Sequence, residues 1–431
     1  MAPRQVIIIG GGIAGLCAAI HCERMSIDWI LLEASKRLGG RVGTRVIDGC
    51  RIDHGFAVLL TAYPELRGMI DLKQLDLRSF QSGALVQRAG KFTRLANPLR
   101  HPLQAVASAL TGAMSVADAC RILPIALRAA FAPSITDPDV SHGYSARDLL
   151  QQRKVSDQLV DGFFRPFFGG VFLDGSLGAD AAAFEFRLAM FARGVAALPV
   201  AGMGEIARQL IEQIPNSRVR TATTVREVIR TSEDASPTRW RVATTAGETH
   251  EASAIIVALD ADGAQSLLPS LPSRSWCSTA AITWRVDRAK LPPSLCEAIL
   301  LIDGDGTGPV NHLCAPTSVA GEYAPQGTSL ISGNVIDPIA LARRDEDLEC
   351  DARSQMSNWF GNEATRHWKL VCIDRIAHAL PRQHPNDLEA RPQMDQGGGL
   401  FLAGDHVTDG SINGAMRSGR VAAAAVSALL G

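Results

Sequence analysis

The sequence predicts an α/β protein built from two interleaved domains, and three observations lead to this prediction. Val6–Ile9 is a wholly apolar, β-branched run, which is typical of a buried parallel strand. Glycines and a helical pattern over Leu16–Met25 follow, and the apolar run Trp29–Leu32 completes a strand–helix–strand unit. Strand-like runs return in the middle and near the end of the chain, whereas residues 98–193 are rich in Ala, Leu and Phe and predict mostly helices.

The order of these runs predicts how the chain is divided. We expect a dinucleotide-binding domain of Rossmann type from residues 1–78, 198–268 and 386–431, and a sheet-plus-helices domain from residues 79–197 and 269–385. The later elements that we expect are strands over Val219–Ile229, Trp240–Thr245, Ile255–Leu259, Ala280–Val286, Ala298–Ile302, Ser329–Val335 and Leu400–Ala403, and helices over Gly202–Ile214, Asp345–Trp359 and Asn413–Leu430.

Composition and charge exclude several classes of protein. The chain has 431 residues, of which 46% are hydrophobic, and this is ample for a core. The net charge is -1, so no basic field favours nucleic-acid binding. The nine cysteines include no Cys-x-x-Cys pair, so we expect reduced thiols and no metal site. No basic and apolar leader precedes the first glycines, and we therefore expect a cytoplasmic protein.

Leu103–Phe131 is the stretch that comes closest to a membrane segment. It is rich in Ala and Leu, but it also carries Asp118, a proline and two arginines. These residues predict a soluble helical pair and not a membrane span. The alternative is an amphipathic surface that makes peripheral contact with a membrane.

A glycine loop lies directly between the first strand and the first helix. Gly10, Gly12 and Gly15 form a G-x-G-x-x-G pattern. The first glycine permits the tight turn, the second lets the backbone approach a pyrophosphate, and the third lets the helix pack close to the sheet. The free N–H groups of the helix start then face the phosphates. This pattern predicts a bound dinucleotide.

Glu33 ends the second strand at the offset expected for a ribose-binding acid. A carboxylate there accepts hydrogen bonds from ribose hydroxyls and repels a ribose phosphate, so it disfavours NADP. The loop and the acid together are compatible with both NAD and FAD.

Two further segments favour FAD. Gly40 and Arg41 follow the second strand and offer a close backbone approach and a guanidinium to a phosphate. Gly404 and Asp405 follow a late apolar run, and Ser411–Met416 begins the last helix, whose N–H groups are suited to a carbonyl-bearing group. A long dinucleotide with a flavin head fits two such segments at opposite ends of the chain.

Together these segments resemble the flavin amine oxidase superfamily, which includes monoamine and polyamine oxidases, protoporphyrinogen oxidases, and phytoene or carotenoid desaturases. The matching blocks are Val6–Glu33, Gly39–Arg41, Thr221–Ile229 and Leu402–Arg420. Asp53–Phe56 and Phe163–Phe172 are most similar to bacterial phytoene desaturase-like members. The resemblance implies FAD, and no cysteine follows Cys372 to link it covalently, so we expect it to be bound non-covalently.

The resemblance also implies a set of FAD contacts. For the adenosine and pyrophosphate half, the resemblance implies that Gly10, Gly12, Ile13, Ala14 and Gly15 lie along the pyrophosphate, that Glu33 contacts the adenosine ribose and that the backbone of Val225 contacts the adenine. Gly40 and Arg41 would lie along the phosphates and the ribityl chain, and Asp405 at the ribityl or phosphate region. Gly55, Phe56 and Ala57 would lie near the flavin ring, and the helix start with Asn413 and Ala415 at the flavin carbonyl. Ala34 and Gly404 are assigned to the same site.

No catalytic side chain is assigned, because a flavin accepts the hydride and the protein supplies position and exclusion of water. His54 lies where the chain is expected to near the flavin, and a hydrogen-bonded structural role is its simpler interpretation. Four other histidines lack ligand-like spacing and are interpreted as ordinary polar residues. They are His312, His378, His384 and His406.

Two departures from amine oxidases bear on the substrate. Those enzymes place a lysine on a strand of the substrate domain, and Ser278–Val286 contains none. They also place an aromatic residue before the last helix, where this chain has Ser411 and Ile412. The aromatic run Phe163–Phe172 is predicted either to pack at a helix end or to line a tunnel for an extended apolar molecule, and Leu95–Phe131 would add an apolar mouth.

The sequence therefore predicts an FAD-dependent oxidoreductase that takes a hydride from a small lipophilic substrate and forms a C=C bond. One alternative is an amine or protoporphyrinogen oxidase, and another is a redox-neutral isomerase that uses reduced flavin. A flavin-free prenyl-binding protein of the GDP-dissociation-inhibitor type is a third, against which the intact Glu33, Asp405 and Asn413 argue. The sequence does not distinguish oxygen, a quinone or another oxidant as the electron acceptor.

Overall fold

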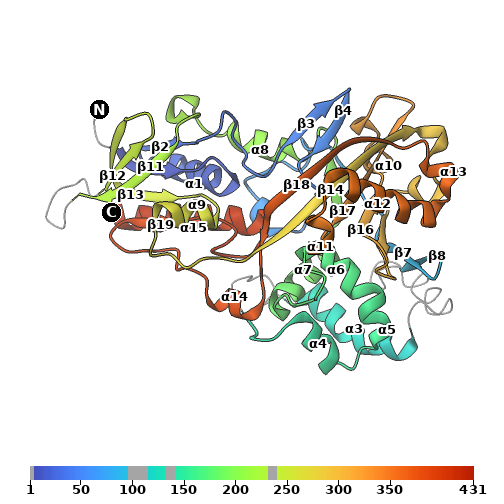
Figure 1. Ribbon diagram of the computed structural model, residues 1–431. Helices are drawn as coiled ribbons and strands as arrows, with labels where there is room; N and C mark the ends of the chain where they lie inside the picture. The colour runs from blue at the N-terminus through green and yellow to red at the C-terminus, as the bar shows by residue number, and fades with distance from the viewer. Residues whose placement is uncertain (1–3, 96–114, 133–140, 232–239) are drawn as a thin grey trace.

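The computed structural model describes residues 4–95, 115–132, 141–231 and 240–431. Figure 1 shows a first sheet with its helices on one side of the molecule, a second sheet with its helices on the other, and a helical layer below them. The α/β class and the dinucleotide-fold start predicted from the sequence are confirmed.

The first sheet is assembled from segments that are far apart in the sequence. Its order is β10-β2-β1-β13-β12-β11, and β19 also pairs with β13. Its strands are β1 (Arg4–Ile9), β2 (Trp29–Leu32), β10 (Val219–Arg220), β11 (Val225–Arg230), β12 (Trp240–Thr244), β13 (Thr249–Val257) and β19 (Leu400–Leu402). β1 runs parallel to β2 and β13, and β13 runs parallel to β19, so their carboxyl ends share one edge. The apolar runs are buried on both faces, as such parallel strands require.

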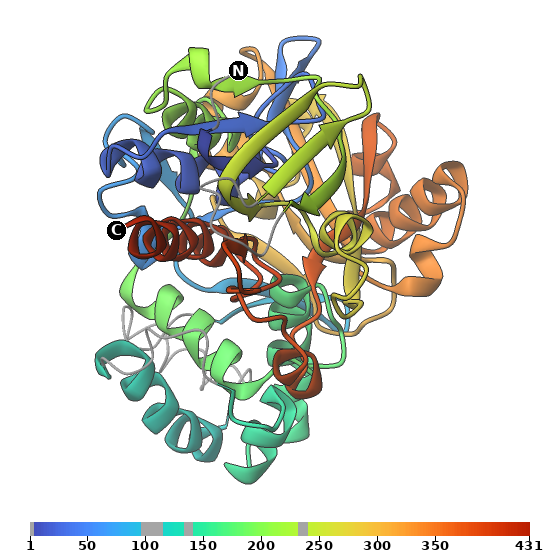
Figure 2. The ribbon, with the colours of Figure 1, turned by 90° about the vertical axis from the view of Figure 1, so that its left-hand side faces the viewer.

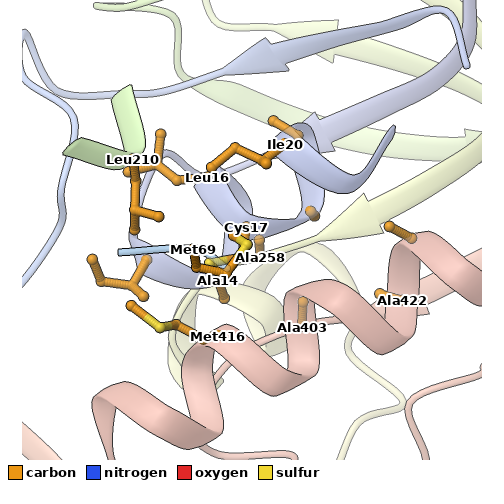
Figure 3. Packing of buried hydrophobic residues seen from close by; sticks show 14 of the residues in the cluster. Ala14, Leu16, Cys17, Ile20, Met69, Leu210, Ala258, Ala403, Met416 and Ala422 are labelled. Atoms are coloured by element: carbon orange, nitrogen blue, oxygen red, sulfur yellow. The ribbon is translucent and has the colours of Figure 1, made fainter. Parts of the chain in front are cut away.

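The two chain ends meet on one face of this sheet. α1 (Ile13–Arg24) lies against α15 (Ile412–Leu430), and Figure 3 shows Met416 and Ala422 of α15 in the same cluster as Ala14 and Cys17 of α1. The contact is close, because a Cβ added to Gly419 would clash with the carbonyl oxygen of Ala14. Small residues in α15 therefore allow the last helix to pack directly on the first.

The second sheet has the order β18-β14-β17-β16-β15-β7-β8. Its strands are β7 (Ala84–Arg88), β8 (Lys91–Leu95), β14 (Trp276–Asp287), β15 (Leu300–Asp303), β16 (Val310–Cys314), β17 (Thr328–Val335) and β18 (Lys369–Pro381). β14 pairs antiparallel with both β17 and β18. α12 (Asp345–Phe360) packs against this sheet through Leu348, Ala352 and Met356. Figure 2 shows the ribbon of this part of the chain, coloured orange, beside the sheet.

The helical layer contains the aromatic run. Its helices are α3 (Val116–Phe131), α4 (Ala146–Gln152), α5 (Asp157–Leu159), a π-helical turn over Val160–Phe164, α6 (Arg165–Phe172) and α7 (Ala181–Arg193). The remaining elements include the hairpin β3 (Thr44–Ile47) and β4 (Cys50–Asp53), the small sheet of β5 (Leu59–Leu60), β9 (Ala196–Pro199) and β6 (Leu77–Ser79), and the helices α8 (Gly204–Ile211), α9 (Ala261–Leu267), α10 (Pro316–Val319), α11 (Pro338–Leu341), α13 (Asn362–Thr365) and α14 (Pro385–Glu389).

One predicted strand is wrong. Val219–Ile229 is not continuous, because Ala222 has a φ of +52° and the chain turns there. β10 and β11 then lie at opposite edges of the first sheet. Nine strands of the described residues were not predicted from the sequence: β16 and β18, and the seven strands from β3 to β9. Parts of the helical prediction for 98–193 lie outside the described residues, and the described parts are largely helical.

Candidate cofactor and substrate site

The three glycines of the loop differ in what surrounds them. A Cβ added to Gly10 would lie 2.5 Å from the carbonyl oxygen of Ala258, and one added to Gly15 would clash with the carbonyl oxygen of Gly10. A Cβ on Gly12 would meet nothing within 4 Å. Gly12 is also the N-cap of α1, and no side chain of the described residues caps that helix start. Free N–H groups beside open space fit a dinucleotide phosphate.

Glu33 lies at the same edge of the sheet and contacts the glycine loop. Its Oε2 accepts a hydrogen bond from the N–H of Gly11 at 2.6 Å, and its Oε1 accepts one from the N–H of Ser35 at 2.8 Å. The carbonyl of Glu33 accepts from the N–H of Thr223, in the segment that leads to Val225. The structure thus brings Glu33, its neighbour Ala34 and the start of β11 to the carboxyl end of β2.

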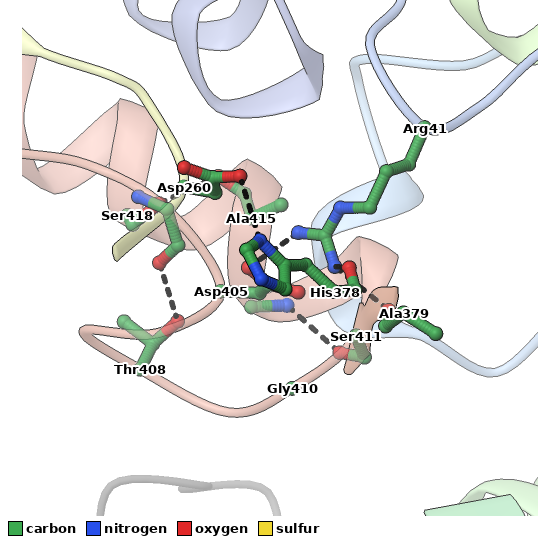
Figure 4. A network of polar contacts seen from close by, with 12 residues as sticks. Arg41, Asp260, His378, Ala379, Asp405, Thr408, Gly410, Ser411, Ala415 and Ser418 are labelled. Atoms are coloured by element: carbon green, nitrogen blue, oxygen red, sulfur yellow. Dashed lines mark hydrogen bonds and ion pairs between the residues drawn. The ribbon is translucent and has the colours of Figure 1, made fainter. Parts of the chain in front are cut away.

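Arg41 joins the N-terminal segment to the C-terminal one, as Figure 4 shows. Its Nη2 lies 2.6 Å from Oδ1 of Asp405, and its Nη1 donates to the carbonyl of Ala379 at 2.8 Å. Burial acts to lower the pKa of Arg41, but the charge and hydrogen bond of Asp405 raise it overall. The guanidinium therefore stays cationic beside the glycine loop, where the Gly39 N–H donates to Gly11.

The start of α15 is held by its own side chains. Oγ of Ser411 accepts from the N–H of Gly414 at 2.9 Å, and Oδ1 of Asn413 accepts from the N–H of Glu65 at 3.1 Å. Asn413 is buried and its side chain faces the protein, whereas Ala415 is half-buried. Gly404 donates its N–H to Oγ of Ser418 at 2.8 Å, which ties the preceding loop to the helix.

The segment Gly55–Ala57 follows Asp53, a half-buried carboxylate that had no role assigned from the sequence. Asp53 accepts hydrogen bonds from the Met203 N–H at 2.8 Å and from the Tyr323 hydroxyl at 2.7 Å. Burial raises the pKa of this carboxyl group, although these hydrogen bonds oppose the rise. Gly55 has a φ of +85°, and Phe56 and Ala57 line a cavity. The side chain of His54 is exposed.

This cavity has a volume of about 420 Å³ and a mainly apolar wall. Phe56, Ala57, Ser411 and Ile412 are among its lining residues. The aromatic run supplies much of the rest, with Phe163, Phe164, Phe167 and Phe168 joined by Phe191 of α7 and by Ile122 and Ala126 of α3. The run also packs in the core, since the rings of Phe168 and Phe184 are 4.5 Å apart. Both interpretations of Phe163–Phe172 therefore apply.

The cavity presents no unpaired charge among its described lining residues. Its one charged side chain is the buried Arg187, whose Nη1 lies 2.8 Å from Oδ2 of Asp409 and whose Nη2 donates to the carbonyl of Gly410 at 2.8 Å. His312 also lines the cavity, and burial lowers its pKa to about 4, so its ring is neutral. Arg187 was not predicted as a site residue, although the charged pair Glu185 and Arg187 inside a mostly apolar helix is a signal that could have found it.

His378, His384 and His406 are not among the lining residues of this cavity. Nε2 of His384 is 2.8 Å from Asp174, and the His378 ring stacks on Trp276 with Nε2 3.2 Å from Asp262. His406 is buried, and burial lowers its pKa to about 4. Within the described ranges, no group of three His, Cys, Asp or Glu side chains is arranged to hold a metal ion. All nine cysteines carry free thiols.

The comparison with protein families identifies the class. The model of the family "Flavin containing amine oxidoreductase" matches residues 13–427. The chain belongs to this family of FAD-dependent oxidoreductases, and its cofactor is FAD. In the part of the chain that the structure describes, no helix is long and apolar enough to cross a membrane.

Individual relatives match shorter parts of the chain than the family model does. Coproporphyrinogen III oxidase of Bacillus subtilis is 29% identical over 180 residues, which cover 39% of this chain and 37% of that one. Carotenoid 3,4-desaturase of Haloarcula japonica is 38% identical over 82 residues, or 17% of each chain. The chain thus spans little more than a third of the length of the Bacillus relative and less of the Haloarcula one.

Solved structures share the fold over nearly the whole chain. An oxidoreductase from Methanosarcina mazei aligns with a TM-score of 0.73 at 17% identity, over 97% of this chain and 99% of that one. A putrescine oxidase variant aligns with a TM-score of 0.70 at 16% identity, over 99% of each chain.

Proposed function

We propose that this protein is an FAD-dependent oxidoreductase that takes a hydride from a neutral lipophilic substrate and leaves a C=C bond. The observation that carries this proposal is the apolar cavity of about 420 Å³, whose lining includes Phe56, Ala57 and the start of α15. These are the segments expected to face the flavin ring. A substrate in the cavity would therefore lie between the flavin and the aromatic wall.

The residues expected to hold FAD come from both ends of the chain and from its middle. Gly12 and the start of α1 would take the pyrophosphate, Glu33 the adenosine ribose, Val225 the adenine, and Arg41 with Asp405 the phosphate and ribityl region. FAD, when bound, would supply a two-electron acceptor for the substrate's hydride, the proton from the neighbouring carbon would pass to solvent, and oxygen, a quinone or another external oxidant would take up the electron pair.

The chain's own contribution is to bind and orient the substrate and to exclude water. The aromatic wall buries an apolar molecule and leaves its polar groups few partners. An ammonium group would meet no acidic side chain among the described residues of the wall, and its desolvation would be uncompensated. This favours a neutral substrate over an amine.

Porphyrinogen oxidation is the second candidate, because the match to coproporphyrinogen III oxidase extends over 180 residues. A porphyrinogen carries carboxylates, however, and the single cation of the described cavity wall is already paired with Asp409. The match to a carotenoid 3,4-desaturase supports the first candidate.

Flavin reduction without oxygen tests the proposal. The holoenzyme is mixed anaerobically with a partly saturated polyene, with coproporphyrinogen or with putrescine, and the loss of the visible flavin absorbance is followed. We expect reduction by the polyene, with a product whose conjugation is one double bond longer. Reduction by the porphyrinogen alone would establish the second candidate. Reduction by the amine alone would contradict both, and protein that stays colourless after FAD is added would favour a binding protein.

A further inference from the structure

His312 is a polar side chain set into the mainly apolar wall of the cavity. It belongs to β16, which meets helix α6 at this point, and Figure 1 shows the two elements next to each other. The residue is 3% exposed, and the ring centroids of Phe56 and Phe167 lie 6.0 and 6.1 Å from that of its own ring. Phe56 is part of the segment expected near the flavin ring. His312 therefore lies in the part of the wall where the reacting end of a substrate is expected.

Contacts with α6 fix the orientation of the His312 ring. Its Nε2 lies 3.0 Å from the carbonyl oxygen of Pro166, which also accepts a hydrogen bond from Nδ2 of Asn311 at 2.9 Å. The ring fills the space beside Gly170, where an added Cβ would clash with it. The backbone N–H of His312 donates to Oδ1 of Asn334 at 3.0 Å. The hydrogen bond to α6 and the space at Gly170 thus hold the ring in one position.

The same contacts determine which ring nitrogen carries the proton. A carbonyl oxygen can only accept, so Nε2 of His312 donates to Pro166. Burial lowers the pKa of the ring to about 4, although the carbonyls of Pro166 and Phe167 oppose this shift, and the ring is therefore neutral at neutral pH. In a neutral ring the second nitrogen is an acceptor. Nδ1 of His312 accepts no hydrogen bond from any group in the described part of the chain.

Two other polar side chains of the wall are already engaged. The hydroxyl of Ser411 donates to Asp409 at 2.6 Å, and Arg187 forms its ion pair with the same carboxylate. A purely apolar substrate would bury the acceptor Nδ1 of His312 without a donor, which weakens binding, whereas a ligand with a hydroxyl group would pair it. A site that offers such an acceptor discriminates strongly against ligands that lack the donor.

We propose that Nδ1 of His312 accepts a hydrogen bond from a hydroxyl group of the substrate, so that His312 determines the specificity of the cavity. The substrate is then a neutral lipophilic alcohol and not a pure hydrocarbon. This inference rests on the proposed function for the reaction that follows binding. The recognition of the hydroxyl group itself does not depend on turnover.

Ligand binding to the full-length, flavin-loaded protein tests this recognition. The probes are parinaryl alcohol, which is a fluorescent polyene alcohol, its methyl ether, and the hydrocarbon of the same chain. The ether keeps the oxygen atom but has no proton to donate. Fluorescence titration gives the dissociation constants for the wild type, for His312→Leu and His312→Gln, and for the control Leu188→Ala, which changes an apolar residue of the same cavity. All variants are first checked for the flavin spectrum and thermal unfolding of the wild type.

We expect the wild type to bind the alcohol at least about tenfold more tightly than the ether or the hydrocarbon, because only the alcohol pairs the acceptor. His312→Leu should lose this preference by weakening the binding of the alcohol alone. His312→Gln keeps a donor for Pro166 and an acceptor oxygen, and it should retain part of the preference. Leu188→Ala should weaken the binding of all three ligands alike and keep the preference.

Three results would overturn the assignment of His312. They are a wild type that binds the alcohol no better than the ether, a wild type that binds none of the three ligands, and a His312→Leu variant that keeps the preference. The first comparison uses the wild type alone, so it is decisive even if a variant fails to fold. Because binding is measured without turnover, these failures leave the flavin-reduction test of the proposed function unaffected, and a failure of that test would leave a measured preference for the alcohol in place.

Discussion

Gly12 faces open space, whereas Gly10 and Gly15 lie against backbone atoms. A side chain at Gly12 is therefore compatible with the fold but occupies the space expected for the pyrophosphate. We predict that Gly12→Val folds and purifies without FAD, whereas Gly15→Val fails to fold. Gly321→Val is the matched control, since a Cβ there also meets nothing within 4 Å, and it should retain FAD. Flavin content measures FAD binding, and circular dichroism measures folding. A fully flavin-loaded Gly12→Val protein would show that the loop is misinterpreted.

Glu33 has two structural contacts and one expected ligand contact. We predict that Glu33→Ala weakens FAD binding by about 1–3 kcal/mol, because ribose hydroxyls lose their acceptor and the Gly11 N–H loses its partner. Glu33→Gln, which keeps an acceptor oxygen, should lose less. Flavin fluorescence titration measures both affinities, and an unchanged dissociation constant for Glu33→Ala would reject the ribose assignment.

His312 predicts a pH dependence of stability. Burial lowers the pKa of this ring from 6.5 to about 4. Between these values the unfolded chain binds a proton that the folded chain does not, so stability is fully present above pH 6.5 and falls as the pH is lowered toward 4. The loss is of the order of 3 kcal/mol. Urea unfolding at several pH values measures the free energy of unfolding. This free energy should fall less steeply with decreasing pH for His312→Gln than for the wild type, and the control His54→Gln, at an exposed residue, should behave as the wild type does.

At the scale of elements, one buried ion pair connects α7 to the loop that begins α15. Arg187 and Asp409 are almost fully buried, and Oγ of Ser411 donates to Asp409 at 2.6 Å. Removing one partner leaves an uncompensated charge, so we predict that Arg187→Met costs about 3–5 kcal/mol in the free energy of unfolding. The double variant Arg187→Met with Asp409→Leu should be more stable than the single one. Equal stability of the single variant and the wild type would show that the pair contributes nothing.

The arrangement of elements explains why α15 needs such small residues. Its Gly419 lies against the backbone of Ala14 and Ala18, and this contact connects the first and last helices of the chain. The sequence predicted a helix over Asn413–Leu430 but not its partner. Only the structure shows that the partner is α1.

At the scale of the whole molecule, strands from the two chain ends and from the middle segment form one sheet. Because FAD is expected to contact residues from all three, its binding should stabilise the whole chain and not a single segment. We predict one thermal transition that rises with FAD concentration, by about 2.7 kcal/mol at a hundredfold excess over the dissociation constant. Gly12→Val should show no rise. Two separate transitions in scanning calorimetry, with only one sensitive to FAD, would contradict the interleaved domain division.

The N-terminal unit was predictable because its sequence motif is local, although its strand and helix also contact distant parts of the chain. Val6–Ile9, the three glycines and Glu33 lie within 30 residues. The role of each can be predicted from the apolar pattern of the strand or from the backbone conformation that only glycine allows. β18 escaped prediction because it is partly exposed along its length and lacks a clean alternation of buried and exposed residues. Its place is decided by pairing with β14, which lies about 90 residues earlier in the chain.

The sequence by itself determined the dinucleotide-fold start, the family and the FAD cofactor. These depend on motifs with short spacing and on single positions where the backbone requires glycine, and both are visible in the sequence. Tertiary structure decided the rest. The pairing of Arg41 with Asp405 joins residues 364 positions apart. The neutral aromatic cavity exists only where α3, α6, α7 and the start of α15 meet. Such contacts depend on how the entire chain packs, because no local pattern specifies which distant surface will cover a given side chain.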